Sequence, residues 1–149
     1  ILPDTYKVLS GHKNIVATKE ANHDISSIAK TISLCGDDLM VYSGEDSQTL
    51  PIMALGGIGV ISVFSNIMPA TMKDLTTAML NENYAVAREI TSKYISLMDA
   101  MFMDVNPIPV KEALSQMGYC SNICRLPLTT MTDSDIAKMT SVLKEYSLI

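Results

Sequence analysis

Three short apolar segments, separated by stretches with helical periodicity, limit what this chain can fold into. The segments are Ile15–Lys19, Leu39–Ser43 and Gly59–Val63, and each has the length of a strand. Between them, residues 24–34 and 47–55 carry apolar side chains at helical spacing. Strands that alternate with helices in this way indicate βαβ units and a parallel sheet. Because the segments have few alternating polar positions, we expect the strands to be buried on both faces.

Polar residues mark where these helices begin. Asn22 or Asp24 is placed to cap the helix over residues 24–34, and Asp46 to cap the helix over residues 47–55. Asp133 is in the same way expected to cap the last helix of the chain. The sequence therefore assigns each of these side chains a local role at a helix N-terminus.

The pattern changes after Val63, where helices replace strands. Residues 69–80 and 84–104 are periodic, and Asn106–Lys111 opens another helix because both of its prolines suit a first turn. Residues 120–131 are expected to form a loop. The many methionines in these helices suit either a promiscuous groove or core filling, and we favour core filling.

The composition excludes several classes of protein. The 149 residues are 48% hydrophobic and carry a net charge of −5, which suits one globular domain and argues against nucleic-acid or anionic-membrane partners. The apolar runs are too short to span a bilayer, and no secretory signal is visible. Cys35, Cys120 and Cys124 are odd in number and lack paired metal-type spacing, so we expect free thiols, no metal and a cytoplasmic protein.

Lys19 is the residue with the most distinctive chemical setting. The period-two rule places Ile15, Ala17 and Lys19 on one face of their strand, so that a lysine closes an apolar face. Desolvation disfavours the charged form of an amine, and a neutral amine can attack a ketone to form a Schiff base. The alternative is a lysine at a strand end that extends to water.

Three strands are too few for a closed parallel sheet. The strands Ile15–Lys19 and Gly59–Val63 would each expose an unpaired apolar edge, and nothing else in the sequence reads as a strand. The chain also begins with Ile1. We therefore expect a fragment, a processed product or a trimmed sequence, and we expect the chain to self-associate as a homo-oligomer.

Several motifs, taken together, identify a family that this chain resembles. They occur in the family's order and cover nearly the whole chain: Lys19-Glu20-Ala21, Tyr42-Ser43-Gly44-Glu45-Asp46, Gly56–Val63, Asn66, Asn106–Lys111 and Arg125-Leu126-Pro127-Leu128. This set resembles dihydrodipicolinate synthase. The related N-acetylneuraminate lyases share the strand lysine and the glycine-rich third strand but match less well at Asn106–Lys111.

The resemblance implies an α/β fold, a partial (β/α)8 barrel followed by a C-terminal helical segment. A complete barrel needs roughly 250 residues, so the chain resembles about the last half. Its strands would then be the sixth to eighth, and residues 3–11 the fifth helix. Residues 1–68 would form the partial barrel, and residues 69–149 the last barrel helix and the C-terminal segment, in one structural unit.

The resemblance also implies a site. Lys19 would be the Schiff-base lysine that binds pyruvate, with Gly44 and the backbone of Ile61 lining the pyruvate pocket and Glu45 next to the second substrate. The implied reaction condenses pyruvate with aspartate semialdehyde in lysine biosynthesis, without a cofactor. This chain departs from the family by having Glu45 in place of Asp or Asn, and Asn22-His23 in place of a small residue and glycine.

The catalytic set that the resemblance implies is incomplete within these residues. The family's proton-relay tyrosine, threonine pair and arginine have no counterpart before residue 3. We therefore expect the isolated chain to be a poor catalyst. The open alternatives are an enzyme part that needs a separate N-terminal half, a non-catalytic self-associating half-barrel, and a related aldolase such as N-acetylneuraminate lyase.

Overall fold

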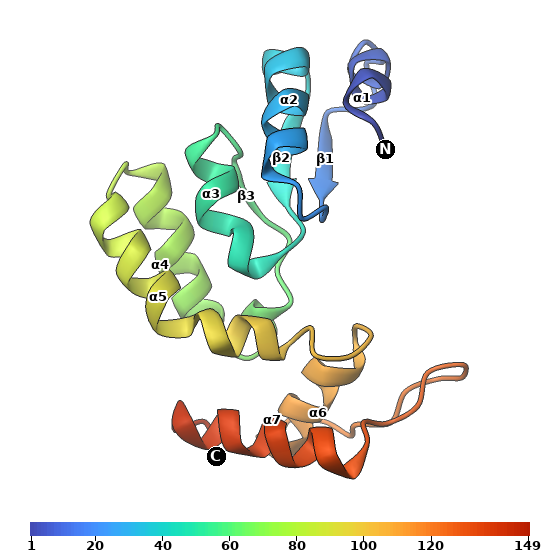
Figure 1. The fold of residues 1–149 in the computed structure, drawn as a ribbon, viewed down its shortest axis with the longest axis vertical. Coiled ribbons are helices and arrows are strands. Elements are labelled where there is room, and N and C mark those ends of the chain that lie inside the picture. The colour runs from blue at the N-terminus through green and yellow to red at the C-terminus, as the bar shows by residue number, and fades with distance from the viewer.

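The computed structural model describes residues 1–149 and contains three strands and seven α-helices. In chain order these are α1 Pro3–Ser10, β1 Ala17–Glu20, α2 Ile25–Cys35, β2 Met40–Ser43, α3 Thr49–Ala54, β3 Gly59–Val60, α4 Pro69–Leu80, α5 Tyr84–Ala100, α6 Ile108–Gln116 and α7 Asp133–Glu145. Three short 3₁₀ turns complete the set: η1 Gly36–Asp38, η2 Asp46–Gln48 and η3 Phe64–Asn66. The N- and C-termini lie at opposite ends of the molecule (Figure 1).

The sheet is parallel throughout, as the alternation of strands and helices predicts. Its strand order is β1-β2-β3, and Lys19, Tyr42 and Gly59 share one register level. The edge strands β1 and β3 each pair with a neighbour on one side only. All carboxyl ends therefore lie at the same edge of the sheet.

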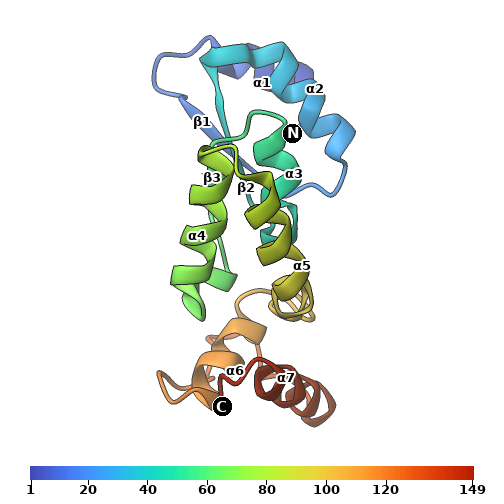
Figure 2. The ribbon, with the colours of Figure 1, turned by 90° about the vertical axis from the view of Figure 1, so that its left-hand side faces the viewer.

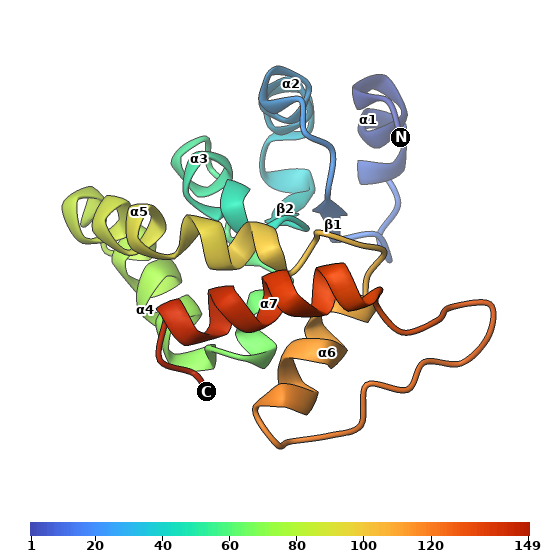
Figure 3. The same ribbon diagram turned by 60° about the horizontal axis from the view of Figure 1, so that its bottom comes forward.

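One face of the sheet is covered by helices and the other is open, which corrects the expectation of strands buried on both faces. Val41 is 2% exposed and packs with Ile28 of α2 and Ile52 of α3. Met40 and Ile61, by contrast, are 43% and 49% exposed. Helices α1, α2 and α3 form an arc along one side of the strands (Figure 3).

The largest core lies in the C-terminal part. Nineteen buried residues form one cluster, and fully buried members include Leu97 and Met98 of α5 and Met139 and Leu143 of α7. The buried methionines fill this core, as predicted. In Figure 2, α6 and α7 form a layer below α4 and α5. The long loop between α6 and α7 extends away from the body of the molecule (Figure 3).

Several boundaries differ from the sequence-based expectations. The first strand begins at Ala17 and not at Ile15, and the third ends at Val60 and not at Val63. Helix α5 ends at Ala100. The third strand is short because the N–H groups of Val63 and Phe64 donate to a side chain and not to a neighbouring strand.

The expected helix caps are right in one case and wrong in two. Asp24 does cap α2, since its Oδ1 accepts the N–H of Ser27 at 3.1 Å. At α7 the cap is Thr132, whose Oγ1 accepts the N–H of Asp135 at 3.2 Å, and Asp133 is the first helical residue. Asp46 caps no helix that follows it, because its carboxylate bonds to a segment seventeen residues further along the chain. None of the helices combines the length and apolar character needed to cross a membrane.

Candidate functional site

Lys19 lies in β1, where Tyr42 of β2 is its register partner. Residues at one level of a parallel sheet project from the same face, so Lys19 belongs to the open face. Its side chain is exposed, which corrects the expectation of a buried strand lysine. The physical reason is that the helices which follow each strand pack on the opposite face.

The period-two rule places Ile15 on the same face as Lys19, and the structure shows that this prediction is wrong. It packs beside Tyr6, Cys35 and Leu39. The hydroxyl of Thr18 donates a hydrogen bond to the hydroxyl of the same Tyr6 at 3.1 Å. The alternation fails at Ile15 because the regular strand begins two residues later.

Gly44 lies directly against the side chain of Lys19. A Cβ at position 44 would stand 2.8 Å from Cβ of Ala21, 3.0 Å from Cε of Lys19 and 3.1 Å from Cγ of Lys19. The N–H of Gly44 donates to the carbonyl of Glu20 at 2.7 Å and so continues the β1–β2 ladder. Only a residue without a side chain fits at this point of the sheet edge.

Ile61 completes the set at the carboxyl edge. Its N–H donates to the carbonyl of Ser43 at 2.8 Å, which places its main chain beside the residue that precedes Gly44. The structure therefore brings Lys19, Gly44 and Ile61 to adjacent strand ends. Barrel enzymes place their chemistry at this edge of the sheet.

Glu45 follows Gly44 but is almost enclosed, at 8% exposed. Burial raises the pKa of its carboxyl; the charge of His23 lowers it, while the charges of Asp46 and Asp99 raise it further. The Ser43 hydroxyl donates to the Glu45 carbonyl at 2.6 Å, and the Glu45 N–H donates to the same hydroxyl oxygen at 3.2 Å. Glu45 is therefore held in the loop after β2, where burial disfavours the charged form of its carboxyl.

His23 belongs to the second departure from the pattern of the family that the motifs resemble, the pair Asn22-His23, and it lies near the same loop. It is exposed, and its Nδ1 stands 3.3 Å from Nε2 of Gln48 in η2. The two departures, which are 22 residues apart in sequence, thus meet across the loops that follow β1 and β2. His23 is therefore a surface residue of the loop between β1 and α2.

Asp46 is a residue of this site that the sequence analysis missed. It is 1% exposed, and its Oδ2 accepts the N–H of Val63 at 3.0 Å and that of Phe64 at 2.8 Å. Its Oδ1 is buried without a hydrogen-bond partner. The bonded residues are too distant in sequence for any local pattern to indicate them.

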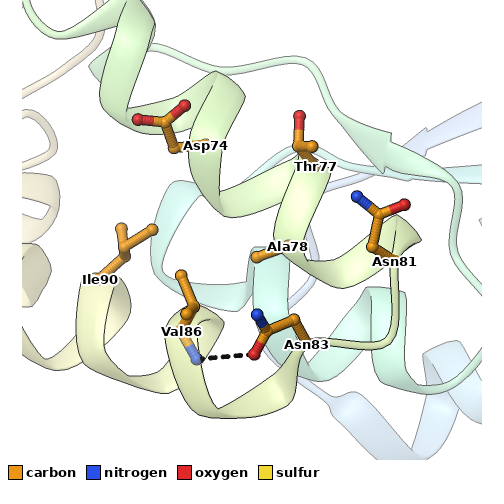
Figure 4. A pocket seen from close by; sticks show the side chains of 7 residues that line it. All are labelled: Asp74, Thr77, Ala78, Asn81, Asn83, Val86 and Ile90. Atoms are coloured by element: carbon orange, nitrogen blue, oxygen red, sulfur yellow. Dashed lines mark hydrogen bonds between the residues drawn. The ribbon is translucent and has the colours of Figure 1, made fainter.

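The largest hollow of the molecule lies elsewhere, between α4 and α5 (Figure 4). It measures about 380 Å³ and is lined by Asp74, Thr77, Ala78, Asn81, Asn83, Val86 and Ile90. Asn83 is engaged in capping, since its Oδ1 accepts the N–H of Val86 at 3.3 Å. None of the predicted site residues lines this hollow.

The three cysteines are free thiols, with Cys35 buried, Cys124 partly buried and Cys120 exposed. No group of three or more His, Cys, Asp or Glu side chains is placed to hold a metal ion. The chemical groups available at the carboxyl edge of the sheet are therefore an amine, carboxyls and main-chain amides.

Comparison with known sequences identifies the family. A profile of the Dihydrodipicolinate synthetase family matches residues 1–146. The 4-hydroxy-tetrahydrodipicolinate synthase of Trichlorobacter lovleyi is 46% identical over 149 residues, which are 100% of this chain and 51% of that protein. The chain thus spans about half the length of the curated relatives it matches.

Solved structures agree with the sequence comparison. Dihydrodipicolinate synthase from Aquifex aeolicus is 42% identical, with a TM-score of 0.94 over 99% of this chain and 51% of that chain. The chloride-inhibited dihydrodipicolinate synthase from Acinetobacter baumannii, solved in complex with pyruvate, is 32% identical, with a TM-score of 0.95 over 99% and 51%. The sheet and helices described above thus have the fold of part of this barrel family, and the resemblance drawn from the motifs is confirmed: the chain belongs to the dihydrodipicolinate synthetase family.

Proposed function

We propose that this chain carries the Schiff-base centre of a dihydrodipicolinate synthase, with Lys19 as the nucleophile that binds pyruvate. The observation that carries the proposal is the contact between Gly44 and Lys19, where a Cβ would fall 3.0 Å from Cε of the lysine. Because position 44 carries no side chain, the side chain of Lys19 can lie against the main chain at the end of the next strand, where its amine is held at the carboxyl edge of the sheet. The pyruvate complex of the Acinetobacter baumannii relative supports the choice of ligand.

The position of the strands in the complete barrel belongs to the same proposal. We assign β1, β2 and β3 to the sixth, seventh and eighth strands, with residues 1–68 as the partial barrel and residues 69–149 as the last barrel helix and C-terminal segment. The parallel order β1-β2-β3 and the helices that follow each strand support this assignment.

The proposed reaction begins at the amine of Lys19. The neutral amine of Lys19 attacks C2 of pyruvate to give a carbinolamine, which loses water to form an iminium ion. Loss of a proton from the methyl carbon gives an enamine, whose carbon attacks the aldehyde of aspartate semialdehyde and forms the new carbon–carbon bond. Hydrolysis of the product iminium then restores the lysine amine, so no further cofactor takes part.

Gly44 and Ile61 contribute to this site by shape. The N–H of Gly44 is bonded to Glu20 and that of Ile61 to Ser43, so neither N–H is free to hold the carboxylate of pyruvate. Gly44 instead lets the side chain of Lys19 pack against its main chain, and the main chain of Ile61 forms the wall at the next strand end.

The proton relay and the clamp for the second substrate must come from residues other than these 149. The matched motifs include no counterpart of the family's relay tyrosine, threonine pair or arginine. We therefore propose that catalysis requires a further polypeptide segment, whether it lies in the same chain or in a separate one.

The test is to trap the Schiff base. The chain is incubated with pyruvate and sodium borohydride, digested and mapped by mass spectrometry. Hydride reduces the C=N bond to a secondary amine, so the adduct adds one carboxyethyl group to the lysine. We expect this mass on Lys19, its loss in Lys19→Ala and its retention in the control Lys7→Ala. An adduct confined to Lys7, Lys13 or Lys111 would overturn the assignment.

A further inference from the structure

Asp46 connects two loops that are separate in sequence. It begins η2 after β2, and its Oδ2 accepts the N–H groups of Val63 and Phe64, which lead into η3 after β3. At 3.0 and 2.8 Å both bonds have the usual length of an N–H···O hydrogen bond. The carboxylate is 1% exposed, so water does not compete for these bonds.

These bonds place Ile61 between two hydrogen-bonded points of the main chain. On its N-terminal side, the N–H of Ile61 is fixed to the carbonyl of Ser43 at 2.8 Å. On its C-terminal side, Asp46 holds Val63 and Phe64. Asp46 supplies the only side-chain hydrogen bonds from the β2 loop to this segment, so without it no hydrogen bond from that loop fixes the main chain after Ile61.

We propose that Asp46 is a positioning residue, which fixes the main chain of Ile61 relative to Lys19 and Gly44 and so sets the affinity of the site for pyruvate. This inference rests on the proposed function of Lys19 and adds a residue to it. Asp46 acts through the backbone and does not touch the reacting atoms.

A purely local role for Asp46 does not account for its bonds. A cap of the helix that follows would accept N–H groups of residues 48 or 49, whereas Asp46 accepts those of Val63 and Phe64. The Oδ1 atom is left buried without a partner, which costs free energy. The two hydrogen bonds that Oδ2 accepts from the loop after β3 act against that cost.

An asparagine at this position keeps the connection. Its single carbonyl oxygen can accept both N–H groups, and its amide would stand where Oδ1 now has no partner. Asp46→Asn therefore serves as the conservative variant, and Asp46→Ala removes both bonds. Asp4→Ala in α1, an exposed position, is the control for loss of one negative charge.

The experiment measures borohydride trapping at Lys19 against pyruvate concentration. We expect Asp46→Ala to raise the half-saturating concentration by about tenfold or more, because the main chain of Ile61 is then misplaced. The maximal yield of adduct should be nearly kept, because the nucleophile itself is unchanged. Asp46→Asn should recover most of the affinity. Asp4→Ala should match the unsubstituted chain.

A second measurement is independent of pyruvate. Amide hydrogen exchange should accelerate at Val63 and Phe64 in Asp46→Ala and return towards the original rate in Asp46→Asn. If Asp46→Ala does not fold, Val63→Pro takes its place, because proline deletes one of the two donors, and φ at Val63, −88°, has the negative sign that proline requires. That variant should shift the half-saturating concentration in the same direction.

The outcomes separate the two proposals. Absence of any adduct on Lys19 in the unsubstituted chain would overturn the proposed function. An adduct on Lys19 with the same half-saturating concentration in Asp46→Ala, or in Val63→Pro where Asp46→Ala does not fold, would leave that function intact and overturn the positioning role. Weakened binding that Asp46→Asn fails to recover would also overturn it, since the effect would then follow the charge and not the two bonds.

Discussion

Gly44 and Lys19 are in contact at the carboxyl edge of the sheet, and the contact leaves no space for a side chain at position 44. A Cβ there would lie 3.0 Å from Cε and 3.1 Å from Cγ of Lys19, and 2.8 Å from Cβ of Ala21. Ala21 directly follows Glu20, the last residue of β1, so its Cβ can withdraw only if the end of the strand shifts. The lysine would have to move.

Replacement of Gly44 by alanine should therefore displace the Lys19 amine. We expect Gly44→Ala to lose most of the pyruvate adduct and to destabilise the fold by about 1–3 kcal/mol, the usual range for overpacking. Trapping yields and chemical denaturation measure the two effects. The matched control is Gly11→Ala, where φ is −72° and a Cβ would meet only the Val8 carbonyl at 3.5 Å. Equal trapping by both variants would show that the contact does not restrict the amine.

The isolated 149-residue polypeptide should not catalyse the condensation. The matched motifs include Lys19 but no relay tyrosine, threonine pair or arginine, and a nucleophile without its proton shuttle and substrate clamp is a poor catalyst. A coupled assay with pyruvate and aspartate semialdehyde measures this. Turnover within an order of magnitude of about 10 per second, the median for enzymes, would contradict the prediction and would mean that other residues of the chain supply the relay.

The open face of the sheet should promote self-association of this polypeptide. Met40 and Ile61 are 43% and 49% exposed, and β1 and β3 each have one unpaired edge. Such edges and apolar faces pair readily with a second copy. We expect a dimer or tetramer in sedimentation at micromolar concentration, and its dissociation or unfolding in Ile61→Lys and Met40→Lys.

The control for this experiment is Val8→Lys, a change at an exposed position on α1. It adds the same charge on the covered side of the sheet and should leave the assembly unchanged. A stable folded monomer of the unsubstituted chain would defeat the prediction.

The buried Glu45 should make the fold less stable as the pH rises above the range in which glutamate ordinarily titrates. Burial raises the pKa of its carboxyl in the folded state above the ordinary value of 4.5. The folded state therefore holds its proton more tightly than the unfolded state, and the favourable contribution is present below the unfolded pKa and is lost as the pH passes the folded pKa. Thermal unfolding followed from pH 4 upward measures the effect.

Glu45→Gln removes this dependence and should raise the unfolding midpoint at neutral pH, because a neutral amide carries no desolvated charge. Glu145→Gln, at an exposed position near the chain end, is the control and should leave the pH profile unchanged. A profile for Glu45→Gln that parallels the original one would show that the Glu45 carboxyl does not contribute.

The local pattern of the sequence predicted the elements well. The apolar segments and helical periodicity placed all three strands and the helices within a few residues, and the cap at Asp24 follows from a contact three residues away. These features depend on near neighbours along the chain. The motifs around Lys19, Gly44 and Ile61 likewise predicted which strand ends come together, because parallel pairing brings consecutive carboxyl ends to one edge.

The tertiary structure decided what the pattern left undetermined. An apolar strand can be buried on one face or on both, and only the packing of α2 and α3 shows that Val41 is covered while Met40 and Lys19 are exposed. An aspartate before a helix reads as a cap, yet the carboxylate of Asp46 bonds to main-chain groups that come near it only when β2 and β3 pair. Sequence periodicity reports the preferences of a single element, whereas burial and long-range hydrogen bonds depend on which elements fold against one another.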